Sequence, residues 1–168
     1  MATTLDDFTA HLAFSLIAGT IVWILFADRN RKHLLWSLLA ALMSGVLIDA
    51  DHLIDYYLAF GVDFRLNYFL QGYEIVKSGK QYLFLHGYEY LVILVTLFFI
   101  VKNQLWRMVI TALIFSMVLH LAVDMSLYRV PASSYSLVYR ANHHFDMQLL
   151  VSPDDYRKLL EKRLRLGL

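Results

Sequence analysis

The chain of 168 residues is 59% hydrophobic and only 17% charged, whereas soluble domains carry about 25% charged residues. A net charge of +1 argues against binding to nucleic acid, which needs a basic surface. No cysteine occurs, so any metal must be bound by His, Asp or Glu.

Four apolar segments predict helices that span a membrane. They are residues 8–27, 34–48 with an extension into the residues that follow, 82–101 and 108–123. A spanning helix needs about 20 mostly apolar residues, and each segment reaches this length only by including ionisable residues at one end. The short connections at 28–33 and 102–107 predict antiparallel neighbours. We therefore predict an all-α fold, an integral membrane four-helix bundle.

The C-terminal segment has the pattern of a basic amphipathic helix. Ser152 is followed by Pro153 and two acidic residues, which is typical of a helix N-terminus. We predict two parts, a four-span membrane domain with an interfacial metal site at residues 1–151 and this helix at 152–168. The helix either lies on an anionic membrane surface or is solvated. Together with the loops it offers a surface to a protein partner.

Nine ionisable residues occur near the ends of the predicted spans, on the side opposite the short connections. They are His11, Asp49, Asp51, His52, Asp55, His86, Glu89, His120 and Asp124. On an ideal helix His120 and Asp124 lie about 40° apart, so both point to the same face. Carboxylates at membrane depth need partners, and these clusters contain no Lys or Arg. Divalent cations would supply the missing positive charge.

These imidazoles and carboxylates suit zinc, with manganese as the alternative. Their number exceeds one tetrahedral shell, so we expect one to three ions. We predict a metal-ligand set that comprises His11, Asp49, Asp51, His52, His86, His120 and Asp124. A non-enzymatic membrane protein with a structural metal site, presenting its loops and tail to a protein partner, is the alternative to an enzyme.

At these residues the chain resembles a family of bacterial inner-membrane metal-dependent hydrolases that is linked to LexA regulation. The matching residues are Asp49-Ala50-Asp51-His52 at the end of the second span, His86 at the start of the third, and His120-x-x-x-Asp124. Ile48 stands where the family has proline, and His86-Gly87-Tyr88-Glu89 replaces a longer motif that contains a second histidine. The resemblance covers residues from about 11 to 124.

That family is in turn similar to zinc-dependent phospholipase C and the fungal single-strand nucleases. The resemblance therefore implies a membrane-embedded hydrolase of a lipid-phase phosphoester such as a phospholipid, in the bacterial inner membrane. In such an enzyme Asp55 or Glu89 would act as the catalytic base or orient a ligand. The basic residues after the first span and the basic tail favour opposite orientations under the positive-inside rule, so the side that the site faces stays open.

Overall fold

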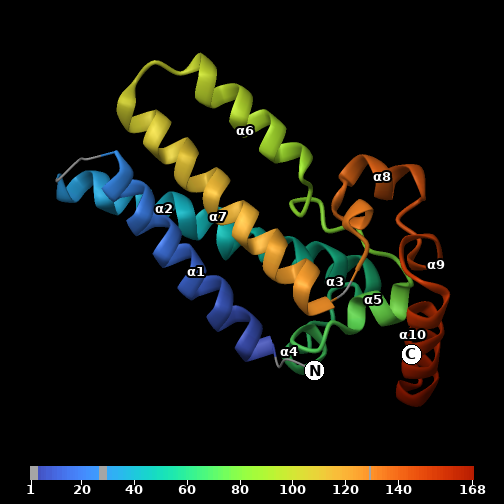
Figure 1. Cartoon of the computed structure of the whole chain (residues 1–168). Helices are drawn as coiled ribbons and strands as arrows, with labels where there is room; N and C mark the ends of the chain where they lie inside the picture. The colour runs from blue at the N-terminus through green and yellow to red at the C-terminus, as the bar shows by residue number, and fades with distance from the viewer. Residues whose placement is uncertain (1–3, 27–29, 129) are drawn as a thin grey trace. The chain divides into compact units, whose positions relative to one another are not determined.

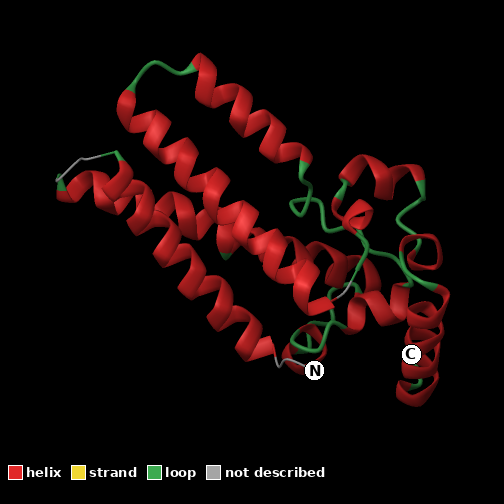
Figure 2. Cartoon of the chain, viewed as in Figure 1, coloured by secondary structure: helices red, strands yellow, loops and turns green. Residues whose placement is uncertain are grey.

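The computed structural model describes residues 4–26, 30–128 and 130–168. These residues form helices and no strand (Figures 1 and 2), with one isolated antiparallel bridge between Lys80 and Asp146. The predicted all-α class is confirmed. The chain divides into two compact units, Met1–Ile48 with Tyr88–Arg129 and Asp49–Gly87 with Val130–Leu168.

This division differs from the boundary predicted after residue 151. Within the regions at 56–81 and 125–151, predicted as loops and tail, the described residues form short helices at 66–69, 73–78, 132–135, 137–142 and 147–150. The C-terminal helix packs against two of these short helices, so it belongs to the second unit.

The first unit consists of four apolar helices, α1 (Thr4–Leu25), α2 (Arg31–Gly45), α6 (Glu89–Ile100) and α7 (Gln104–Tyr128). Helices α1, α2 and α7 pack against one another, and α6 runs beside α7 (Figure 1).

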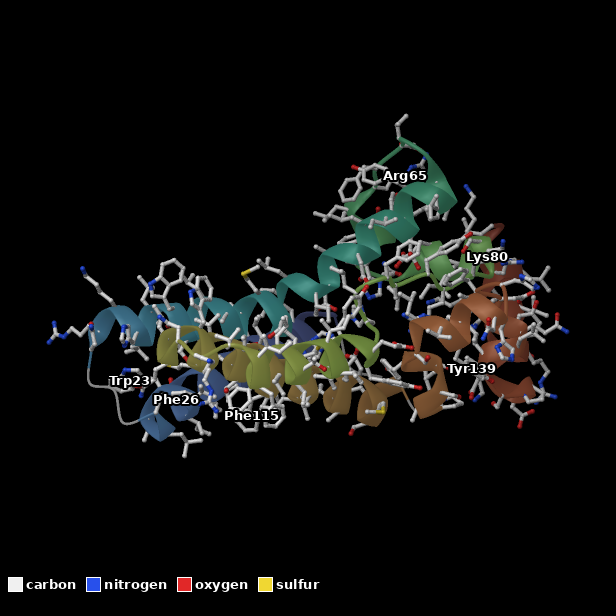
Figure 3. All side chains as sticks on the ribbon, turned by 90° about the horizontal axis from the view of Figure 1, so that it is seen from above. Trp23, Phe26, Arg65, Lys80, Phe115 and Tyr139 are labelled. Carbon is white, nitrogen blue, oxygen red and sulfur yellow. The ribbon has the colours of Figure 1, made fainter. Side chains whose placement is uncertain are left out.

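Small side chains fill the interface of α1, α2 and α7. The buried hydrophobic core contains Ala18, Val22, Ala40, Ala41, Met108 and Ala112. The larger side chains of Trp23, Phe26 and Phe115, labelled in Figure 3, pack against it. Small residues allow close approach of helix backbones, which is typical of helices that associate within a membrane.

Serine hydroxyls form hydrogen bonds across the same interface. Ser37 Oγ donates to the carbonyl of Gly19 at 2.8 Å, and Ser44 Oγ donates to that of Leu113 at 2.9 Å. Such interhelical bonds from small polar side chains are a second feature of membrane helix packing.

The outer surface of the first unit is apolar. Leu25, Phe99 and Trp106 are 72%, 77% and 58% exposed. Two helical stretches, Phe8–Leu25 and Gln104–Leu127, are long and apolar enough to cross a membrane. A third stretch meets these criteria only when Arg31–Gly45 and Leu47–Phe60 are counted together.

The predicted span at 82–101 is shorter than expected. Helix α6 begins only at Glu89 and has 12 residues, a length of about 18 Å against the roughly 30 Å of a bilayer core. Residues 81–88 are not helical. Asp51 and Asp55 accept hydrogen bonds from backbone amides of this segment, and these bonds hold it in an irregular conformation.

The second unit consists of short helices. They are α3 (His52–Phe60), α4 (Leu66–Phe69), α5 (Tyr73–Ser78), the 3₁₀ helix η2 (Ala132–Tyr135), α8 (Leu137–Asn142), α9 (Met147–Leu150) and α10 (Pro153–Leu166). The 3₁₀ helix η1 (Leu47–Asp51) precedes α3. Helix α3 packs against α5, and α10 packs against α5 and α9.

The predicted C-terminal amphipathic helix is confirmed as α10. Ser152 Oγ accepts a hydrogen bond from the amide of Asp155 at 3.2 Å, and Pro153 occupies the first turn. Hydrogen bonds from Lys158 and Ser152 hold the pKa of Asp155 below its usual range. The helix therefore begins where the cap pattern predicts.

Candidate metal centres

The first candidate centre lies between α1 and α7. His11 Nε2 is 3.2 Å from Asp124 Oδ1, and His120 Nε2 is 3.4 Å from Asp124 Oδ2. The two imidazole rings stack with centroids 4.0 Å apart. All three residues are buried and offer ligand atoms within 4.8 Å of one another, so this first trio could hold a metal ion.

Backbone contacts orient the first trio. His120 Nδ1 lies 3.1 Å from the carbonyl of Gly45. A carbonyl can only accept, so Nδ1 carries the proton and Nε2 keeps its lone pair on the side of Asp124. Ser15 Oγ donates to the carbonyl of His11 at 2.7 Å, and Ser116 Oγ lies 3.2 Å from Ser15 Oγ.

A shallow apolar groove runs between α1 and α7. Its volume is about 370 Å³, and its lining residues are Ala10, Phe14, Leu119, Ala122, Val123, Ser126 and Leu127. Ala10, Leu119 and Val123 are the immediate neighbours of His11, His120 and Asp124 along the chain. The groove therefore adjoins the first trio along both helices, and none of the three ligand side chains lines it.

The second candidate centre lies within the second unit. Asp51, His52 and His86 offer ligand atoms within 4.8 Å of one another, and this second trio could also hold a metal ion. His86 Nδ1 is 3.1 Å from Asp51 Oδ2, and His86 Nε2 is 3.1 Å from Asp49 Oδ1. The rings of His52 and His86 meet edge to face at 5.5 Å.

The irregular segment before α6 positions His86. Asp55 accepts hydrogen bonds from the amides of Tyr82 at 2.9 Å and Leu83 at 3.3 Å, one on each carboxylate oxygen. Asp51 Oδ2 accepts from the amide of Leu85 at 2.7 Å. Both oxygens of Asp55 are thus engaged by backbone, which favours its orienting role over the role of catalytic base.

Arg140 also holds the same segment. Its guanidinium is fully buried and donates to the carbonyls of Leu83 at 2.7 Å, His86 at 3.2 Å and Ser134 at 2.5 Å. These bonds tie α8 to the residues around His86. Arg140 could not be identified from the sequence, because nothing in its local pattern separates it from a solvated basic residue.

Glu74 is a further acidic residue that the sequence analysis missed. It lies in α5, is 1% exposed, and places Oε1 3.3 Å from His52 Nδ1. Among the described residues, neither Glu74 Oε2 nor Asp51 Oδ1 has a hydrogen-bond partner. Helix α5 lies in a region predicted as a loop. The only sequence signal for Glu74 was therefore an isolated acid among apolar and aromatic residues.

The nine predicted residues are thus divided between the two units. The first unit contains His11, Glu89, His120 and Asp124, and the second contains Asp49, Asp51, His52, Asp55 and His86. Glu89 is half-buried at the first residue of α6 and belongs to neither trio. His86 precedes the helix that the sequence analysis expected it to open.

The donor sets fit a metal ion in each unit. Imidazole and carboxylate suit zinc and other divalent metals of the first transition row. Buried carboxylate oxygens without hydrogen bonds are costly, and a cation beside them offsets that cost.

Comparisons with models of protein families, with curated proteins and with solved structures gave no match for this chain. The family resemblance at the Asp49, His86 and His120 motifs therefore stays a prediction.

Proposed function

We propose that this protein is a membrane-embedded, metal-dependent hydrolase of a phosphoester in the lipid phase, such as a phospholipid. The observation that carries the proposal is the first trio beside an apolar groove, on helices long and apolar enough to cross a membrane. A lipid is the kind of substrate that presents a phosphate next to an apolar chain.

Each residue of the first trio has a role in this proposal. His11, His120 and Asp124 would hold the metal, with the carbonyl of Gly45 keeping the His120 proton on Nδ1. A bound zinc or manganese ion would supply Lewis acidity toward phosphoryl oxygens and would lower the pKa of water. The groove would bind an acyl chain and exclude bulk water from one side of the site.

The second trio has ligands of the same kinds and would bind a metal in its own unit. Asp51, His52 and His86 would hold a further ion, with Asp49 beside His86. Asp55 and Arg140 fix the segment that carries His86 through bonds to its backbone. Glu89 would act as a base or an orienting residue, a role that rests on the sequence pattern alone. The proposed location, the bacterial inner membrane, rests on the family resemblance.

A structural metal is the second candidate function. The first trio joins α1 to α7, and an ion bound there would tie two long helices together. The basic face of α10 would then serve a protein partner. A closed shell of four protein ligands would favour this candidate, whereas an open position would favour the hydrolase.

The first test measures metal content of the detergent-purified protein. Wild type is compared with His120→Ala and Asp51→Ala, and with His33→Ala as the matched control outside both trios. We expect each ligand variant to lose at least half of the bound metal of its own unit, while His33→Ala retains all of it. Equal loss in all three variants would show general destabilisation instead of ligation.

The second test measures release of headgroup or phosphate from mixed phospholipid vesicles. The metal-loaded wild type is compared with His120→Ala and with a chelated sample, to which zinc or manganese is then returned. We expect activity only in the wild type and in the reconstituted sample. Tight metal binding without activity on any lipid class would replace the hydrolase by the structural candidate.

A further inference from the structure

Glu74 is a buried acid whose place in the second unit the proposed chemistry does not yet use. It is the acidic residue in the first turn of α5, and its carboxylate is 1% exposed. Helix α5 packs against α3, which carries His52 at its first residue. This packing places Glu74 Oε1 3.3 Å from His52 Nδ1.

The contact determines which nitrogen of His52 is free to bind a metal. A carboxylate only accepts hydrogen bonds, so Nδ1 must donate, and a neutral imidazole then keeps its lone pair on Nε2. Histidines that bind metals commonly donate their other ring N–H to a carboxylate or a backbone carbonyl. The carbonyl of Gly45 stands in the same relation to His120 in the first trio.

Two buried acids of the second unit support this role. Glu74 Oε2 and Asp51 Oδ1 are both buried and have no hydrogen-bond partner in the part of the chain that the structure describes. Lys162 of α10 interacts electrostatically with Glu74, but no hydrogen bond reaches Oε2. A cation held by Asp51, His52 and His86 would compensate both acids.

We propose that Glu74 is a positioning residue of the second trio, which orients His52 and holds its proton on Nδ1 so that Nε2 is the metal ligand. This inference rests on the metal binding proposed above. Glu74 lies outside the second trio and would set both the zinc affinity of that trio and the tautomer of His52. Glu74 is not itself a member of the trio, whose ligand atoms lie within 4.8 Å of one another.

The C-terminal helix is bonded to α5, the helix that contains Glu74. Arg163 of α10 donates from Nε to the carbonyl of Val76 at 2.6 Å and from Nη2 to that of Lys77 at 2.9 Å. These carbonyls belong to the last turn of α5, where a positive charge also complements the helix dipole. Gly79 ends α5 with a φ of +69°, and a Cβ there would lie 3.0 Å from Arg163 Nη2.

The test uses the full-length protein in detergent with two variants of Glu74. Glu74→Leu keeps similar volume but has no acceptor, and Glu74→Gln keeps an oxygen that accepts from Nδ1–H. Glu161→Ala, which removes an exposed acid on α10, is the matched control. The readouts are the affinity for zinc alone and the tautomer of His52 in the metal-free protein, from ¹⁵N–¹H correlations of ¹⁵N-histidine-labelled samples assigned with His52→Asn.

We expect wild type and Glu74→Gln to show His52 protonated at Nδ1, and Glu74→Leu to show a mixture. The affinity of the second site should fall about 10- to 100-fold in Glu74→Leu and far less in Glu74→Gln. Wild-type affinity or an unchanged tautomer in Glu74→Leu would overturn the proposal. An equal loss in both variants would also overturn it, because it would make Glu74 a direct ligand. If the wild type binds no zinc, the proposed function fails, while the tautomer still decides the role of Glu74.

Discussion

At the scale of single residues, Gly45 links helix packing to the first trio. A Cβ at this position would lie 2.0 Å from Ser15 Oγ and 2.2 Å from Ser116 Oγ, which no real contact allows. The carbonyl of the same residue accepts the proton of His120 Nδ1. Absence of a side chain at Gly45 therefore brings α2 close enough to orient a ligand on α7.

We predict that Gly45→Ala lowers the stability of the protein by about 1–3 kcal/mol, because both serine hydroxyls must move. Thermal unfolding in detergent measures the change, and Thr20→Ala is the control because Thr20 is exposed and bonds within its own helix. Adding Ser15→Ala and Ser116→Ala to Gly45→Ala should recover part of the loss. No recovery would mean that the clash lies elsewhere.

Arg140 is the second residue whose effect extends beyond its own contacts. Its guanidinium donates hydrogen bonds to three carbonyls on two segments of the second unit. A lysine ammonium cannot reproduce that geometry. We predict that Arg140→Lys destabilises the protein by on the order of 3 kcal/mol, since buried acceptors lose their donors. It should also weaken zinc binding at the second trio.

Thermal unfolding and zinc titration test this prediction side by side. Arg157→Lys on α10 is the matched control, because Arg157 is exposed and forms only a surface ion pair with Asp154. A stable Arg140→Lys variant with normal zinc affinity would show that the Arg140 guanidinium does not position His86.

At the scale of elements, α5 and α10 form a coupled pair. Only Arg163, among the basic residues of α10, bonds to the carbonyls of Val76 and Lys77. Lys162 approaches α5 less closely, with Nζ 4.9 Å from the ring centre of Tyr73. The basic helix therefore has a packing role in addition to any contact with a membrane or a partner.

We predict that Arg163→Ala loosens α5 without unfolding the first unit. Hydrogen exchange at the amides of residues 73–79 should become faster, because the last turn of α5 loses both bonds from α10. Arg165→Ala, at an exposed position in the last turn of α10, should leave exchange at the wild-type rate. Unchanged protection in Arg163→Ala would show that apolar contacts alone hold α10 in place.

At the scale of the whole molecule, the histidines of the two trios make metal binding depend on pH. Four of the ligand-type residues are histidines that must be neutral to bind a metal, and the ordinary pKa of histidine is about 6.5.

We predict that zinc affinity falls steeply as the pH drops from about 7.5 to about 5.5, because protons compete for the imidazole nitrogens. Binding at pH 6.5 should release protons, which appears as a dependence of the binding enthalpy on the ionisation enthalpy of the buffer. The His11→Ala and His52→Ala variants should each show a smaller release. A pH-independent affinity would mean that carboxylates alone bind the metal.

Much of the fold could be predicted because hydropathy and capping are local properties. The apolar runs predicted α1 and α7, and Ser152 with Pro153 predicted the start of α10. The irregular segment at 81–88 could not be predicted, since carboxylates of Asp51 and Asp55 from another part of the chain hold its amides. The same long-range bonds shortened the expected third span.

The sequence by itself determined the helical class, the apolar exterior and the types of ligand, because composition and spacing set them. Only the tertiary structure decided that His11, His120 and Asp124 form one trio and Asp51, His52 and His86 another, since each set joins residues far apart in the chain. It alone revealed Glu74 and Arg140. Both are ordinary surface residue types whose burial depends on packing between helices that no local pattern specifies.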